Sequence, residues 1–142
     1  MAMMWEDFVG IPFKDKGRDF DGADCWGLFR LVYLHALDIN LPLYMGGYNG
    51  RADKHGVAGL IEDGKRAWDE VESGKEQTYD AILMKIHGFQ HLGLVVESGL
   101  MLHMPRDSYS TMERYDTMRY QNVVEGFYKY VIPYYDDLPE AS

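Results

Sequence analysis

Apolar residues in the first third of the chain follow the period of a helix. Between residues 26 and 37 they recur at steps of three and four, the spacing of a buried helical stripe. This stripe consists of Leu28, Leu31, Val32 and Ala36. Residues 16–22 before it contain glycine and aspartate, which is typical of a loop, and Asp24 or Ala23 stands at the cap position. The pattern therefore predicts a helix with Cys25 in its first turn.

Two weaker segments flank this helix in the sequence. Residues 5–13 predict a short helix or turn that ends at Gly10, because Pro12 restricts the residue before it. From residue 53 to residue 71 helical composition returns, but three glycines interrupt it, each at a cost of about 1 kcal/mol relative to alanine. We expect two short helices there, after an exposed connection rich in glycine over residues 40–50.

The second half of the chain changes to strand-like patterns rich in β-branched and aromatic residues. Strands are predicted at residues 79–86, 91–97, 100–104 and 123–132, with a hairpin turn at residues 97–99. Helices first and strands afterwards predict an α+β domain with antiparallel pairing. We expect a single domain over residues 1–135 and a frayed acidic tail over residues 136–142.

Composition narrows the classes of function. The chain has 142 residues and one cysteine, so an intramolecular disulfide framework is excluded and an ordinary core must stabilise the fold. A formal net charge of −9 disfavours nucleic acid as a partner, because duplex binding needs a basic face. The sequence predicts no membrane span and no signal peptide, so we expect synthesis in a cytoplasm without a leader.

Cys25 is the first candidate for chemistry. A thiol attacks only as the thiolate, and unpaired N–H groups with the helix dipole favour that anion at a helix N-terminus. The ordinary alternative is that a lone cysteine is a small buried hydrophobic residue.

A nucleophilic thiol needs a base within hydrogen-bond reach and a third group that orients the base. His35 lies on the same predicted helix, roughly 15 Å along the axis, and is excluded. His55 lies in a glycine-rich segment. His91 and His103 belong to one predicted hairpin, and a sheet is a rigid support for such a pair.

The geometry of this hairpin tests the pairing of His91 with His103. Their separation of twelve positions is even, so a plain two-residue turn would send the two side chains to opposite faces. A three-residue loop that includes Leu100, or a bulge at Gly93 or Gly99, would return them to one face.

Taken together, these segments resemble a known family. The loop at residues 17–19, the D-C-W-G-L start of the helix, the strand that opens at Asp80, the H-L-G segment at His91 and the later His103 occur in the order seen in NlpC-type cell-wall cysteine peptidases. The resemblance spans residues 5–130 and is strongest to short forms that tailed bacteriophages carry as tail-tip or tail-assembly proteins.

The resemblance implies a papain-like fold, with a cysteine-bearing helix packed on an antiparallel sheet. It implies that Cys25 is the nucleophile, His91 its base and His103 the orienting residue, with no cofactor and no metal. The expected activity is hydrolysis of peptide bonds in the peptidoglycan stem, between D-glutamate and a diamino acid. The expected partners are the stem peptide and other phage tail proteins, and the expected location is the virion tail.

The sequence departs from the family pattern at two positions. Many members have a tyrosine where this chain has Phe13, so its hydroxyl is absent or comes from Tyr48 or Tyr79. Many have serine after the nucleophile, whereas this chain has Trp26, which is expected to reshape the cleft.

Three other functions stay open. A metal hydrolase could use His87, His91 and His103, although Gly88 disfavours the helix that an H-x-x-x-H spacing needs. The domain could be a structural part of a tail with vestigial activity. It could also transfer acyl groups to amines instead of water.

Overall fold

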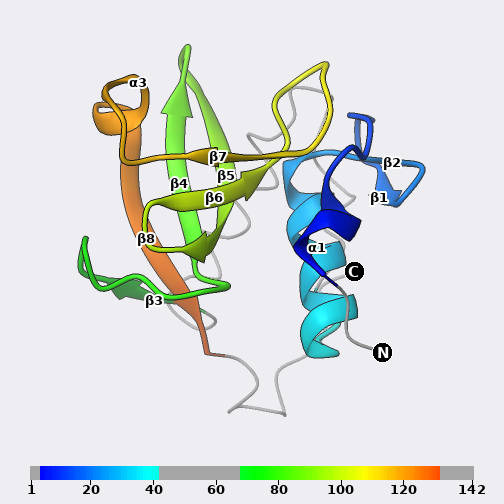
Figure 1. Cartoon of the computed structure of the whole chain (residues 1–142), viewed down its shortest axis with the longest axis horizontal. Helices are drawn as coiled ribbons and strands as arrows, with labels where there is room; N and C mark the ends of the chain where they lie inside the picture. Colours follow the sequence, from blue (N-terminus) through cyan, green and yellow to red (C-terminus); the bar gives the residue numbers. More distant parts are fainter. Residues whose placement is uncertain (1–3, 42–67, 132–142) are drawn as a thin grey trace.

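The computed structural model describes residues 4–41 and 68–131, which form a helical N-terminal part and a sheet (Figure 1). The N-terminal part holds the 3-10 helix η1 (Trp5–Phe8), the two short strands β1 (Arg18–Asp19) and β2 (Gly22–Ala23), and the helix α1 (Cys25–Leu37). The sheet part holds β3 (Trp68–Val71), β4 (Ala81–Ile86), β5 (Phe89–Glu97), β6 (Leu100–His103), β7 (Thr111–Arg114), the short helix α3 (Met118–Gln121) and β8 (Val124–Tyr130).

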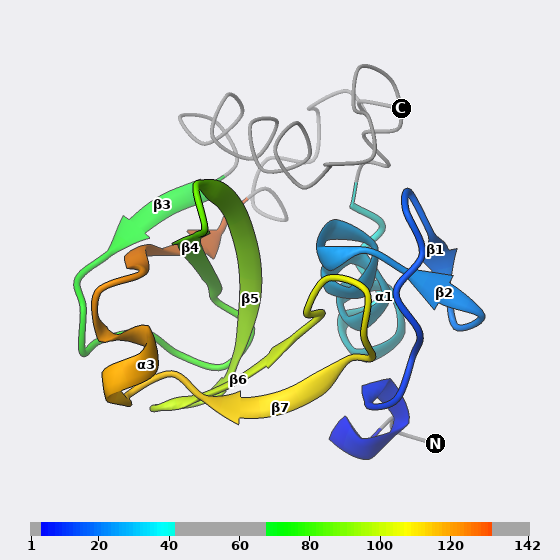
Figure 2. The ribbon, with the colours of Figure 1, turned by 90° about the horizontal axis from the view of Figure 1, so that it is seen from above.

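The sheet has six strands in the order β3-β8-β4-β5-β6-β7, and every neighbouring pair is antiparallel. Seen from above, it is strongly curved and α1 stands beside it, against β5 and β6 (Figure 2). The predicted α+β class and the helix packed on an antiparallel sheet are therefore confirmed. Among the described residues no helix is long and apolar enough to cross a membrane.

Helix α1 begins at the predicted place because Asp24 caps it. The Asp24 carboxylate Oδ1 accepts a hydrogen bond of 2.8 Å from the Gly27 N–H. Asp38 ends the helix in the left-handed conformation. Every residue from Cys25 to Phe29 is buried, whereas Ala36, which we expected in the stripe, is exposed. The first turns of α1 are therefore enclosed on all sides, and its last turn carries no buried residue.

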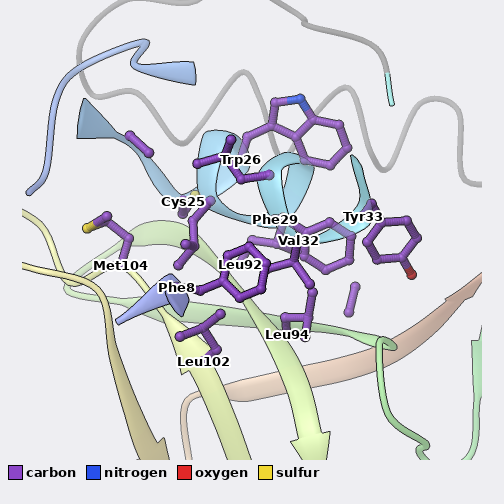
Figure 3. Packing of buried hydrophobic residues seen from close by; sticks show 14 of the residues in the cluster. Phe8, Cys25, Trp26, Phe29, Val32, Tyr33, Leu92, Leu94, Leu102 and Met104 are labelled. Atoms are coloured by element: carbon purple, nitrogen blue, oxygen red, sulfur yellow. The ribbon is translucent and has the colours of Figure 1, made fainter. Parts of the chain in front are cut away.

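Two groups of buried side chains lie on opposite faces of the sheet, as strand alternation requires. The helix-side core contains Cys25, Leu28, Phe29, Val32, Leu83, Leu92, Leu94, Leu102 and Met104, among others. The far-side core contains Ile82, Met84, Val95, Met101, Tyr115, Tyr120 and Phe127. Figure 3 shows the helix-side core, with α1 lying across the strands.

The prediction of helix up to residue 71 is wrong at its end. Trp68–Val71 form β3, an edge strand in which Trp68 pairs with Tyr130 of β8. Trp68 is buried, and its ring lies 5.6 Å from the Phe29 ring, so tertiary packing overrides the local helical composition. The rest of the two predicted helices, the connection at residues 42–50 and the tail at residues 136–142 lie outside the described residues.

The strands predicted from residue 79 onward are confirmed as β4, β5, β6 and β8, within a few residues at each end. Neither β7 nor α3 was predicted from the sequence. β7 is a short edge strand whose only large apolar residue is Met112, so it carries no alternation to detect. α3 is a single turn. Both elements prove important for the site.

Candidate active site

Cys25 is the first residue of α1 and is buried, with 2 % of its surface exposed. The loop before it is fastened to the helix start through Asp24, which is fully buried. Its Oδ1 binds the Arg18 guanidinium at 2.8 Å, and its Oδ2 accepts from the Lys16 backbone N–H at 3.1 Å. One carboxylate therefore fixes both the cap of α1 and the loop that leads to Cys25.

The hairpin of β5 and β6 brings His91 and His103 together. His91 Nε2 lies 2.9 Å from His103 Nδ1, and both side chains are buried. A two-residue turn at Ser98 and Gly99 joins the strands, so the three-residue loop is not formed. The register shifts between Val95 and Glu97, which places the bulge at Val96. A bulge does restore the common face, but its predicted positions at Gly93 and Gly99 were wrong.

Gly93 sets the register of the two histidines in the pairing of β5 with β6. It pairs directly with His103, and His91 lies two positions earlier on the same face of β5. A Cβ at residue 93 would lie 3.0 Å from the Met101 sulfur and 3.1 Å from the Met84 methyl. A side chain at residue 93 would therefore displace Met101 and Met84, whose ends fill the space beside this glycine.

The hydrogen-bond chain continues beyond His103. Its Nε2 lies 2.9 Å from Glu113 Oε1, on β7. The same oxygen accepts a bond of 2.8 Å from the Tyr120 hydroxyl, on α3. Arg119 donates to the other oxygen, Oε2, at 3.2 Å. Three neighbouring strands and α3 therefore contribute to one chain that runs from His91 to the edge of the sheet.

Burial sets the protonation of both histidines. It lowers the pKa of His91 to about 3, and the neighbouring His103 adds to this effect. Burial also lowers the pKa of His103, although the hydrogen bond and charge of Glu113 partly oppose it. For Glu113, burial raises the pKa, but the hydrogen bonds from His103 and Tyr120 outweigh it and the net shift is downward. At neutral pH the chain therefore consists of two neutral imidazoles and a carboxylate.

Acid is expected to destabilise the protein through His91. An unfolded histidine has a pKa near 6.5, so between pH 6.5 and about 3 the unfolded chain binds a proton that folded His91 does not. Stability is thus complete above pH 6.5 and falls with pH below it, by roughly 2 kcal/mol between pH 7 and pH 5 for one such site. Urea unfolding at several pH values measures this.

His91→Gln should flatten that dependence, whereas His35→Gln, at an exposed position on α1, should not. Equal slopes of the free energy of unfolding against pH for wild type and His91→Gln would contradict the neutral, buried state of His91.

Cys25 lies on the helix side of the sheet, whereas the side chains of His91 and His103 lie on the opposite face of β5 and β6. Leu92 and Leu102 pack with Cys25 in the helix-side core (Figure 3). His91 and His103 are their direct neighbours in sequence, and the His103 ring lies 6.2 Å from Tyr120 of the far-side core. The structure joins His91 to His103 and places Cys25 on α1, which packs against the two strands that carry them. The approach of the sulfur to His91 stays a prediction.

The remaining histidines are alternative candidates for metal ligands or for the base, and the structure describes two of them, His87 and His35. His87 lies in the turn between β4 and β5 with a φ of 52°, so the helix required by the H-x-x-x-H metal site is not formed. No group of three metal-ligating side chains occurs within residues 4–41 and 68–131. His35 lies in the last turn of α1 against the Phe20 ring. His55 falls outside the described residues.

The two departures from the family pattern have different outcomes. Trp26 is 1 % exposed and stacks on Phe29 with ring centroids 5.8 Å apart, so its ring belongs to the core and not to an open cleft. Phe13 is partly buried and forms a bridge with Ala23. Of the two tyrosines named as substitutes, Tyr79 packs its ring on Trp5, and Tyr48 lies outside the described residues.

Sequence reasoning missed Glu113 because it missed β7. β6 and β7 pair His103 with Thr111, so Glu113 lies two positions further on the same face. It repeats, on the next strand, the diagonal relation of His91 to His103. If β7 could be recognised in the sequence, an acidic residue two positions from the partner of His103 would indicate a third member of the hydrogen-bond chain.

A helix that starts at a lone cysteine and packs on a curved antiparallel sheet with a buried histidine pair defines the papain-like class of α+β folds. The model of the NlpC/P60 family matches residues 10–129, and the chain belongs to that family. No curated protein matches the chain.

Solved structures agree on the fold. The NlpC/p60 domain of the peptidoglycan hydrolase SagA is 18% identical, with a TM-score of 0.57 over 87% of this chain and 89% of that one. An NlpC/P60 family protein from Bacillus cereus is 19% identical, with a TM-score of 0.62 over 92% of this chain and 41% of that one. A lipoprotein-like NLP/P60 protein from Staphylococcus aureus is 18% identical, with a TM-score of 0.60 over 92% and 43%. This chain thus spans less than half the length of the last two.

Proposed function

We propose that this domain is a cysteine peptidase that hydrolyses peptide bonds in the stem of bacterial peptidoglycan, between D-glutamate and the following diamino acid. The hydrogen-bond chain from the buried His91 through the buried His103 to Glu113 carries the proposal, since it is the arrangement that holds a catalytic base in one orientation. Membership of the NlpC/P60 family and the place of Cys25 at a helix start support it.

In this mechanism His91 Nδ1 takes the proton of the Cys25 thiol while the sulfur attacks the peptide carbonyl carbon. The tetrahedral intermediate collapses as His91 returns that proton to the amine, the C–N bond breaks and a thioester remains. Water, deprotonated by His91, then attacks the thioester, and the sulfur leaves and regains its proton. Backbone N–H groups at the start of α1 stabilise the oxyanion, an effect of about 2.7–4 kcal/mol per donor in a measured protease.

The decisive experiment is digestion of purified muropeptides, followed by mass spectrometry in water labelled with heavy oxygen. We expect a new carboxyl group at D-glutamate that carries the label, because water is the final acceptor. Wild type should form this product, and His35→Gln, a histidine change on the same helix as Cys25, should form it equally. His91→Gln should lose at least about 10²-fold in rate, the lower limit for a positioned base.

Products in which an added amine replaces the label would show acyl transfer on the same scaffold. Equal rates for wild type and His91→Gln would contradict the role of His91.

We further propose that a bacteriophage tail delivers the domain to the cell wall after its synthesis in the host cytoplasm. The likeness of the D-C-W-G-L segment to short tail-tip forms supports this. The net charge of −9 gives no attraction toward an anionic wall, so attachment would depend on other tail components. Mass spectrometry of purified virions tests the proposal, and absence of the chain from the particles would contradict it.

A further inference from the structure

Glu113 can only accept hydrogen bonds. Its Oε1 receives two contacts, at 2.9 Å from His103 Nε2 and at 2.8 Å from the Tyr120 hydroxyl, and its Oε2 receives the Arg119 guanidinium at 3.2 Å. A guanidinium has no lone pair to accept with, and these contacts together keep the carboxyl group ionised. A proton must therefore lie on His103 Nε2.

That proton determines the rest of the chain. His103 is neutral because burial lowers its pKa, so a proton on Nε2 leaves a lone pair on Nδ1. Nδ1 lies 2.9 Å from His91 Nε2, so this nitrogen of His91 must be the donor. His91 is neutral as well, and its own lone pair then lies on Nδ1, the ring nitrogen outside the chain.

We propose that Glu113 is a positioning residue that fixes the tautomers of both histidines, so that His91 presents an unprotonated Nδ1. In this role Glu113 touches neither substrate nor nucleophile and acts through the imidazole rings of His103 and His91. The usefulness of that tautomer for catalysis rests on the proposed function, since only a lone pair on Nδ1 can take the thiol proton. The tautomer itself is a property of the resting protein.

Without the carboxylate the chain could reverse. His103 would then be able to donate from Nδ1 to His91 Nε2, and His91 would carry its proton on Nδ1. A reversed chain has the same heavy-atom positions and no base, as in a serine protease whose buried aspartate is replaced by asparagine, where kcat falls about 10⁴-fold.

Besides His103, Tyr120 and Arg119 also donate hydrogen bonds to Glu113, and these two contacts differ in strength. Tyr120 is buried and donates to the same oxygen as His103, so its hydroxyl limits how the carboxylate can turn. The Arg119 side chain is 75% exposed, and an exposed ion pair contributes little. We therefore assign the orienting contact to Tyr120.

Nitrogen NMR of the isotopically labelled imidazole rings tests the proposal. In the wild-type protein we expect both His91 and His103 to be neutral with the proton on Nε2. Glu113→Gln, which keeps the shape but can donate as well as accept, should give a mixture of tautomers. Glu113→Ala should shift His91 further toward the Nδ1–H form. Glu125→Gln, an exposed carboxylate change on β8, is the matched control and should leave the spectrum unchanged.

Kinetics on muropeptides give a second readout. Glu113→Gln should lower kcat at least about tenfold, with KM changed less than twofold. The loss should not exceed the roughly 10²–10⁴-fold that a positioned base contributes. A wild-type spectrum with His91 protonated on Nδ1, or identical tautomers in wild type and both Glu113 variants, overturns the proposal. If the tautomers behave as expected but wild type cleaves no muropeptide, the proposed function fails and the role of Glu113 in fixing the tautomers stands.

Discussion

Cys25→Ala is expected to remove muropeptide hydrolysis, with a loss of at least about 10⁴-fold in kcat/KM. In the proposed mechanism the sulfur forms the covalent intermediate, and removal of the nucleophile costs about 2 × 10⁶-fold in kcat in a studied serine protease. The measurement is product formation by mass spectrometry over a long incubation. Hydrolysis by Cys25→Ala at the wild-type rate would end the assignment of a thiol mechanism.

The chain offers two controls for this result. A buried Cys→Ala change usually costs about 1 kcal/mol, so thermal unfolding should show that Cys25→Ala is still folded. In addition, Cys25 is the only cysteine, so thiol reagents report on it alone. Modification of wild type by a substrate-sized reagent, with parallel loss of activity, would show that the sulfur can be reached from solvent.

Gly27→Ala is expected to be the most damaging conservative change for stability. A Cβ at residue 27 would overlap the backbone carbonyl oxygen of Gly17, which packs directly against the first turn of α1. Since a backbone group cannot rotate away, the cost should reach at least about 3 kcal/mol, the upper part of the range for overpacking. For a chain of this size that corresponds to a melting temperature lower by at least about 6 °C, measured by calorimetry.

Gly126→Ala is the matched control for this change. Gly126 lies in β8, and the atoms nearest to a Cβ there belong to the Tyr128 side chain, at 3.4 Å or more, an ordinary contact. We expect its melting temperature to stay within about 2 °C of wild type. A similar small effect of Gly27→Ala would mean that the loop at Gly17 is not held tightly against the helix.

The predictable parts of this fold are those with a local signal. The start of α1 followed from an aspartate before an apolar stripe, and Asp24 does cap the helix. The strands β4, β5 and β6 followed from runs of apolar residues between turn residues. The even spacing of His91 and His103 predicted that a plain turn would separate them, and a bulge prevents this.

The parts that could not be predicted depend on long-range pairing. The bulge at Val96 has no glycine or other residue that marks it in the sequence. Trp68 joins a strand because Tyr130 and Phe29 pack against it, although its own neighbourhood has helical composition. Glu113 enters the site only through an edge strand with no alternation. In each case the deciding partner lies far away in the chain.

The bulge at Val96 also limits how this hairpin can change. His91, His103 and Glu113 share one face only because that single extra residue offsets the two strands. Deletion of Val96 would remove the bulge and leave Gly93 opposite His103, whereas a slip of the strand pairing by one residue would send His91 to the other face of the sheet. Loop grafting at this turn is therefore compatible with the histidine pair only where Gly93 stays opposite His103.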